Sequence, residues 1–251
     1  MKRMPNPKGG YYFLTGIAPY SSGVAAMPGN EIVHVIMRNP PPYRQGFEFI
    51  HSHLAALVRP RHALCAIQLR IPRPFSFEEF SEFNQGYLDI LDEWDLPVDG
   101  VNQVARTNVA PEVGPPAEAV LYAFSYTVPL ENDNLPPTFV IAGAGELGEG
   151  HLSPEYIVRA GETGLDAIRE KVKFVIDIMQ SRLFGLQMKW AQVTTVDIYT
   201  VHALHHLLVE ELLIPMQEAA RHAVRWYYSR PPISGLEYEM DLRGVRRELY
   251  L

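Results

Sequence analysis

The amino-acid sequence predicts an α+β fold built from two similar halves, residues 1–128 and 129–251. Three observations support this prediction. The order strand, helix, strand, helix, strand, strand occurs twice along the chain. A polar, proline-rich stretch at 129–137 lies between the two copies, as is typical of a domain boundary. A chain of 251 residues, 47% of them hydrophobic, is long enough to bury two cores. Each half is expected to form a mixed β-sheet with two helices packed on one face.

The elements of the first half follow from its hydrophobic spacing and its turn residues. The expected order is strand 32–36, helix 47–57, strand 63–71, helix 77–91, strand 104–109 and strand 120–128. Phe47, Ile50 and Leu54 recur at helical spacing, and Pro60 ends the helix that contains them. A Gly-Pro-Pro turn at 114–116 separates the last two strands.

The second half repeats this order with different loop lengths. The expected order is strand 138–142, a long helix from Ser153 to Leu183, strand 193–199, helix 201–220, strand 224–228 and strand 236–242. Ser153 and Pro154 suit the first positions of a helix, and Gly185 is placed to end it. Pro215 should kink or break the second helix, because proline lacks the backbone N–H that a helical turn requires.

Composition and charge exclude several classes of protein. The chain carries 22 Lys and Arg against 29 Asp and Glu, a net charge of −7, so it offers no basic surface for a nucleic-acid backbone. The single cysteine, Cys65, excludes an internal disulfide framework, and its apolar strand predicts a buried, inert thiol. The N-terminus lacks the apolar stretch of a secretory signal, and no segment suits a membrane span. We therefore expect a cytoplasmic protein without membrane or nucleic-acid partners.

Six short segments carry a resemblance to a known family, through their order and spacing. They are Ala18–Val24, Phe83–Tyr87, Ala105–Val109, Val140–Gly143, Val193–Val196 and Leu236–Glu239. Together they resemble the RidA/YjgF family of imine and enamine deaminases, taken twice as a tandem duplication. The resemblance implies a substrate like 2-aminoacrylate or like 2-aminomuconate, and some relatives that act on the latter take part in the breakdown of aromatic compounds. The resemblance implies the chorismate mutase-like fold of that family and a homotrimer with clefts between neighbouring subunits. It also implies hydrolysis, without a cofactor or a metal, of a carboxylate-bearing imine or enamine to an oxo acid and ammonia.

The resemblance also assigns candidate site residues. Arg106 and Arg225 occupy the strand positions that match the family's substrate-binding arginine, and a guanidinium can hold a carboxylate through two parallel hydrogen bonds. Glu237 and Glu239 are the candidates for a general base that activates water. Side chains alternate along a strand, so both glutamates would point to one side. The register of the family favours Glu237, but the short loop after Arg225 leaves Glu239 open as the residue that faces the cleft. The other candidates for substrate binding are Tyr20, Asn84, Asn108 and Gly143.

The two copies have lost different parts of the family's motif. The first half has Met37 at the place of the strand-end glycine and Tyr122 near the place of the glutamate. The second half keeps Gly143 and the glutamates but lacks the Pro-Tyr-Ser motif. Arg225 is therefore expected to matter more than Arg106, and the sequence leaves open which of the two kinds of cleft is active.

Other patterns compete with this interpretation. Gly143–Gly148 matches the G-x-G-x-x-G pattern of dinucleotide-binding loops, but the expected helix starts only at Ser153 and the loop is acidic. His202, His206 and Glu210 share a helix face without forming the H-E-x-x-H pattern, so a metal site is not expected. Two other functions remain as alternatives. One is a non-catalytic protein that binds small oxo acids, and the more distant one is a ribonuclease, against which the net charge argues.

Overall fold

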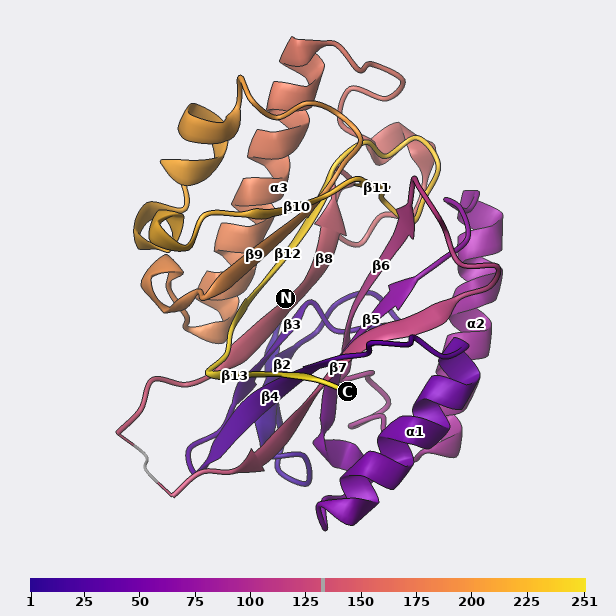
Figure 1. Cartoon of the computed structure of the whole chain (residues 1–251), viewed down its shortest axis with the longest axis vertical. Coiled ribbons are helices and arrows are strands. Elements are labelled where there is room, and N and C mark those ends of the chain that lie inside the picture. Colours follow the sequence, from indigo (N-terminus) through magenta and orange to yellow (C-terminus); the bar gives the residue numbers. More distant parts are fainter. Residues whose placement is uncertain (132–133) are drawn as a thin grey trace.

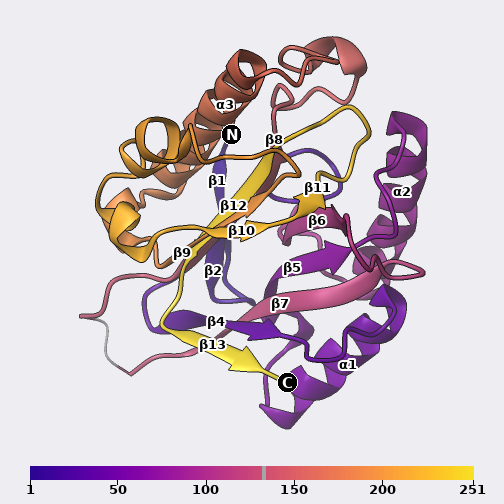
Figure 2. The same cartoon turned by 45° about the horizontal axis from the view of Figure 1, so that its top comes forward.

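The computed structural model describes residues 1–131 and 134–251, which form four layers (Figure 1). Two β-sheets pack against each other in the middle. Helices α1 (Tyr43–Ala56) and α2 (Phe77–Glu93) cover one outer side, and α3 (Leu165–Leu186) covers the other. Figure 2 shows the same separation of α1 and α2 from α3. The fold is therefore α+β, as the sequence predicts.

The first sheet has the strand order β11-β6-β5-β7-β4-β13. Its strands are β4 (Asn30–Ile36), β5 (Leu64–Arg70), β6 (Ala105–Pro111), β7 (Val120–Pro129), β11 (Ser229–Arg230) and β13 (Arg247–Tyr250). β7 pairs antiparallel with β4 and β5, whereas β5 pairs parallel with β6, so the sheet is mixed. Phe47, Ile50 and Leu54 of α1 are buried against it, as their helical spacing predicts.

The second sheet has the strand order β1-β2-β3-β8-β12-β9-β10. Its strands are β1 (Arg3–Asn6), β2 (Tyr11–Leu14), β3 (Gly23–Ala26), β8 (Phe139–Gly145), β9 (Thr195–Tyr199), β10 (Arg225–Tyr227) and β12 (Glu239–Gly244). β12 pairs antiparallel with β8 and β9, and β9 pairs parallel with β10. The order β10-β9-β12-β8 and these pairing directions repeat β6-β5-β7-β4 of the first sheet. The two halves thus share one topology, and their descent from a single RidA-like unit stays a prediction.

Strands cross between the two halves. β1, β2 and β3 from the N-terminus extend the second sheet beside β8, whereas β11 and β13 from the C-terminal half extend the first sheet. The division into 1–128 and 129–251 therefore separates the repeated units but not the hydrogen-bonded sheets. Of the expected boundary at 129–137, residues 132 and 133 lie outside the described residues. The division into two domains stays a prediction.

Apolar side chains from both halves also fill the space between the sheets. Val140 and Ala142 of the second sheet share a buried cluster with Ile32 and Ala105 of the first. Cys65 belongs to this cluster, and burial raises the pKa of its thiol. The prediction of a buried thiol is confirmed.

The helices of the second half differ from the prediction. The long helix begins at Leu165 rather than at Ser153, because Pro154–Tyr156 forms only one 3₁₀ turn and Gly161 adopts a positive φ of 76°. The predicted helix 201–220 is wrong. A π-helical turn at Leu208–Leu213 and a 3₁₀ turn at Gln217–His222 replace it, on either side of Pro215.

The strands differ from the prediction in two further ways. The last inner strand, β12, begins at Glu239 rather than at Leu236, so Glu237 lies before the strand. The sequence analysis missed β1 and β2, which are four residues each and carry prolines or follow a glycine pair. Such short strands lack the length on which an alternating pattern can be recognised.

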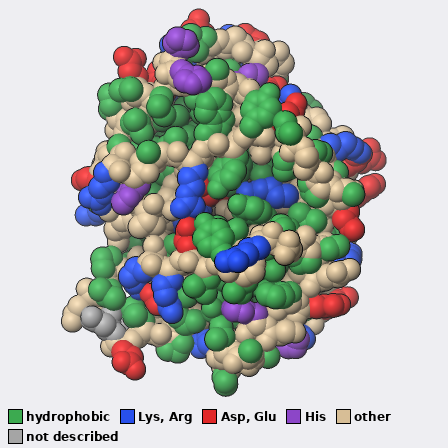
Figure 3. Space-filling model, in the orientation of Figure 1, with side chains coloured by type: hydrophobic (Ala, Val, Ile, Leu, Met, Phe, Trp, Pro, Cys, Tyr) green, Lys and Arg blue, Asp and Glu red, His purple; other side chains and the backbone are tan. Residues whose placement is uncertain are grey.

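The surface carries mixed charge. On the face seen in Figure 3, Lys and Arg side chains are interspersed with acidic and hydrophobic ones. Arg73 pairs with Glu79 and Arg230 with Glu112, both at 2.6 Å. Within residues 1–131 and 134–251, no helix is both long and apolar enough to cross a membrane.

Candidate active site

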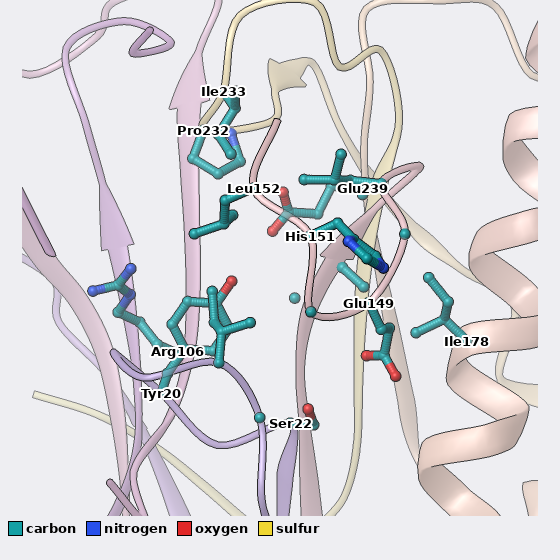
Figure 4. Close-up of a pocket in the computed structure, with 18 of the residues that line it drawn as sticks. Tyr20, Ser22, Arg106, Glu149, His151, Leu152, Ile178, Pro232, Ile233 and Glu239 are labelled. Carbon is teal, nitrogen blue, oxygen red and sulfur yellow. The ribbon is translucent and has the colours of Figure 1, made fainter. Parts of the chain in front are cut away.

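A cavity of about 350 Å³ lies between the two halves of the chain (Figure 4). Its polar lining includes Tyr20, Ser22, Arg106, Asn108, Glu149, His151, Arg182 and Glu239, and its apolar lining includes Phe80, Leu147, Ile178, Ile233 and Leu236. An apolar wall with a few converging polar groups is typical of a small-molecule site. The resemblance implies clefts between neighbouring subunits, whereas this cavity is formed within one chain. The homotrimer stays a prediction.

Arg106 is an unpaired cation at one side of this cavity. It lies on β6, and its guanidinium carbon is 4.8 Å from the ring centre of Tyr20 and 4.6 Å from that of Tyr87. Nη2 donates a hydrogen bond of 2.5 Å to Asn84 Oδ1, but Nη1 is buried without a partner among the described residues. Burial lowers the pKa of Arg106, although an arginine still remains charged. A buried cation without an acidic partner is suited to bind an anion such as a carboxylate.

Two asparagines lie beside Arg106 and differ in their roles. Asn84 is buried on α2 and accepts the hydrogen bond from the guanidinium, so it orients Arg106 rather than lining the cavity. Asn108 follows two residues after Arg106, on the same face of β6, and does line the cavity. Its Oδ1 and Nδ2 are both buried without partners among the described residues. Leaving a buried polar group unpaired costs about 1–3 kcal/mol, so this amide is a candidate ligand contact.

Glu239 supplies a buried acid to the same cavity. It is the first residue of β12, is paired with Gly145 of β8 and Tyr199 of β9, and is 3% exposed. Its carboxyl group makes no hydrogen bond with any residue that the structure describes. Burial, and next the charge of Asp241, raise the pKa of Glu239 well above its usual value. The protonated acid therefore persists at a higher pH than in an ordinary glutamate, as general acid–base catalysis near neutral pH requires.

The carboxyl group of Glu239 lies so close to the backbone of residue 143 that only glycine fits there. A Cβ atom at this position would collide with Glu239 Oε1 and would lie 2.9 Å from Thr107 Cγ2. The Gly143 N–H donates a hydrogen bond of 2.9 Å to Thr107 Oγ1, which ties β8 to β6 across the two halves. The absence of a side chain keeps the space in front of the carboxyl group open.

The structure answers which glutamate faces the cavity. Glu237 lies before β12, and its Oε2 forms a hydrogen bond of 2.7 Å with His202 Nε2, outside the cavity. The two glutamates would share a face only if both lay in a regular strand, and Glu237 does not.

Arg225 also lies away from the cavity. Its side chain is 45% exposed on the edge strand β10 and pairs with Glu248 at 3.2 Å. The expectation that Arg225 matters more than Arg106 stays a prediction, although the structure places Arg106 and not Arg225 at this cavity. The cavity brings Arg106 of the first half together with Gly143 and Glu239 of the second.

Arg182 and Glu149 are among the lining residues that the sequence did not reveal as site candidates. Arg182 lies on the buried face of α3, between Met179 and Leu183 at the helical positions of the apolar stripe. A buried arginine within such a stripe is rare, and that position is the signal that could have found it. Its partner, Glu149, is 33 residues away in sequence, which no local pattern reveals.

The competing motifs have other uses in the structure. Glu146, inside the G-x-G-x-x-G segment, pairs with Lys171 at 3.0 Å and accepts hydrogen bonds from the backbone N–H groups of Glu237 and Tyr238. A fully buried carboxylate there would repel a phosphate. Among the described residues, no three or more His, Cys, Asp or Glu side chains are grouped to hold a metal ion. Of the candidate histidines, His202 has a carboxylate partner, Glu237.

The fold recurs in a solved structure of different sequence. A crystal structure of chorismatase matches with a TM-score of 0.50 and 12% sequence identity, over 89% of this chain and 77% of that one. At this identity the similarity shows the fold alone. Fold and cavity together define a two-sheet α+β protein with a cavity that is lined by the buried side chains of Arg106 and Glu239.

Sequence comparison gives the family. Residues 3–249 match the family described as "2-aminomuconate deaminase CnbZ". The curated 2-amino-5-chloromuconate deaminase of Comamonas testosteroni is 41% identical over 245 residues, which are 97% of this chain and 96% of that protein. The chain belongs to the CnbZ family of 2-aminomuconate deaminases.

Proposed function

We propose that this protein catalyses the hydrolytic deamination of 2-aminomuconate or a close relative to the corresponding oxo acid and ammonia, without a cofactor. One observation carries the proposal. The guanidinium of Arg106 and the carboxyl group of Glu239 border the same cavity. Among the residues that the structure describes, Arg106 has no acidic partner and its Nη1 no hydrogen bond, and the carboxyl group of Glu239 makes no hydrogen bond. Family membership supports the same substrate class.

Arg106 and Asn108 bind the substrate carboxylate that is adjacent to the amino-bearing carbon. The free Nη1 of Arg106 and the free amide of Asn108 are the groups that this carboxylate would satisfy. Asn84 holds the guanidinium from the other side, and the rings of Tyr20 and Tyr87 exclude water from it. The amino-bearing carbon then lies towards Gly143, where no side chain obstructs it.

Glu239 transfers protons in both directions. In its protonated form it donates a proton to the carbon chain of the enamine, which becomes an iminium ion. The resulting carboxylate takes a proton from a water molecule as the water oxygen bonds to the iminium carbon. Glu239 returns this proton to the nitrogen of the resulting carbinolamine. As the C–N bond breaks and ammonia leaves, the hydroxyl group gives its proton to the Glu239 carboxylate and becomes the C=O bond of the oxo acid. One water is consumed, one ammonia and one oxo acid form, and the carboxyl group ends protonated as it began.

Product stoichiometry with two matched variants tests the proposal. Purified protein incubated with 2-aminomuconate should release one ammonia for each oxo acid formed. Glu239→Gln should lower kcat about 100-fold or more, whereas Glu237→Gln, the same change two residues away, should stay near wild type. Ammonia release that is unaffected by Glu239→Gln would contradict the assigned role, and the absence of release by wild-type protein would contradict the function.

A further inference from the structure

A second buried arginine lines the cavity on the side away from Arg106. Arg182 lies on α3, and its side chain is 6% exposed. Nη1 donates hydrogen bonds to the carbonyl oxygens of Ala142 at 2.8 Å and Gly143 at 3.3 Å. Nε and Nη2 donate to Glu149 Oε1 at 2.8 and 2.5 Å. The carbonyl groups of β8 therefore fix the guanidinium in the wall, while its other edge holds a carboxylate.

The carboxylate on Arg182 belongs to a residue that can move into solvent. Glu149 lies in the loop after β8, between two glycines, and its side chain is 31% exposed. Arg182 is its only ion-pair partner among the described residues. Arg182 has no such freedom, and without a carboxylate it would be a buried cation with part of its charge uncompensated. The guanidinium thus requires a carboxylate, and a ligand can supply one in place of Glu149.

The two arginines are placed for a molecule with two carboxylates. Figure 4 shows Arg106 and Glu149 on opposite sides of the cavity, with the carboxyl group of Glu239 between them. We propose, on the basis of the function above, that Arg182 binds the second carboxylate of a dicarboxylic substrate, which displaces Glu149. The exchange replaces one carboxylate by another, so the ion pair is kept while the freed Glu149 is hydrated. A ligand with one carboxylate leaves the pair of Arg182 and Glu149 intact, and the site therefore prefers dicarboxylates.

Two stable ligands that differ by one carboxylate test this preference. Muconate (trans,trans-hexa-2,4-dienedioate) and sorbate (trans,trans-hexa-2,4-dienoate) share a six-carbon diene and lack the amino group, so neither is turned over. Titration calorimetry on the full chain should show that muconate binds the wild type more tightly than sorbate. Glu149→Gln removes the competing charge, so it should tighten muconate binding about 2- to 5-fold and leave sorbate unchanged. Arg182→Gln should weaken muconate at least about tenfold.

Controls separate this inference from loss of structure and from the proposed function. Arg182→Gln removes hydrogen bonds to β8 and can lower stability, so Glu149→Gln is the deciding variant. Glu155→Gln, an exposed acid outside the cavity, should change neither ligand. Equal effects of Glu149→Gln on muconate and sorbate, or no muconate binding by the wild type, would overturn the inference. Ammonia release from 2-aminomuconate is measured separately, so a deaminase without dicarboxylate preference and a dicarboxylate-binding protein without deamination give different results.

Discussion

Replacing Glu239 by glutamine should stabilise the protein increasingly as the pH rises. In the unfolded chain a glutamate loses its proton near pH 4.3, whereas burial holds the folded-state pKa of Glu239 well above its usual value. Between these two pKa values the unfolded state is ionised and the folded state retains the proton. The contribution of Glu239 to stability is therefore complete below about pH 4.3 and is lost as the pH rises through the folded-state pKa.

The size of this effect follows from the proton difference. Between the two pKa values, unfolding releases one proton. The free energy of unfolding therefore falls by about 1.4 kcal/mol for each pH unit in this range. For a chain of this length, that corresponds to about 3 to 6 °C in Tm per pH unit. Thermal melts of wild type and Glu239→Gln from pH 5 to pH 8 should thus diverge, with the variant more stable at the higher pH.

A matched variant makes the melts decisive. Asp177→Asn, which removes an exposed carboxylate of α3, should show no such divergence. Curves of Tm against pH that stay parallel for wild type and Glu239→Gln would refute the claim that Glu239 is held protonated by burial.

Two further substitutions test the surroundings of Glu239. Gly143→Ala should lower stability by about 1–3 kcal/mol, measured by urea unfolding, and should reduce deamination, because its Cβ collides with Glu239 and crowds Thr107. Unchanged activity and stability would show that the close approach is not required. Asp241→Asn should shift the Glu239-dependent limb of the pH–rate profile to lower pH, because the charge of Asp241 raises the pKa of Glu239. The exposed Asp177→Asn should not shift it, and a profile of Asp241→Asn that coincides with wild type would contradict the coupling.

The sequence predicts most of the fold wherever local patterns are long enough. The six elements from 32–36 to 120–128 are found close to their expected positions, because each carries a clear apolar period or is bounded by turn residues. The predicted helix 201–220 fails at Pro215, where packing against α3 retains only short π and 3₁₀ turns. Strands of each half also extend the sheet of the other half. This pairing joins segments that are far apart in the sequence, so a local pattern cannot predict it.

Candidate site residues were found where a family motif marks them. Five of the predicted site residues line one cavity: Tyr20, Arg106, Asn108, Gly143 and Glu239. They were predicted from the order of the family's motifs and not from hydrophobic periodicity. The same motifs placed Arg225 at an equivalent position, yet the three-residue edge strand β10 leaves it exposed. Arg182 and Glu149 carry no motif, and only the packing of α3 against β8 brings them together.

The most direct test of the active-site assignment compares alanine variants of Arg106 and of Arg225, which the sequence ranked above Arg106. Removing one partner of a buried charge pair costs about 2–5 kcal/mol, so Arg106→Ala should lower kcat/KM for 2-aminomuconate roughly 30-fold to several-thousand-fold. Arg225→Ala should stay within about twofold of wild type, because its exposed ion pair with Glu248 is remote from the cavity. Circular dichroism and thermal melts of both variants confirm folding. Wild-type kcat/KM in Arg106→Ala, or an equal loss in Arg225→Ala, would contradict the assignment of this cavity as the active site.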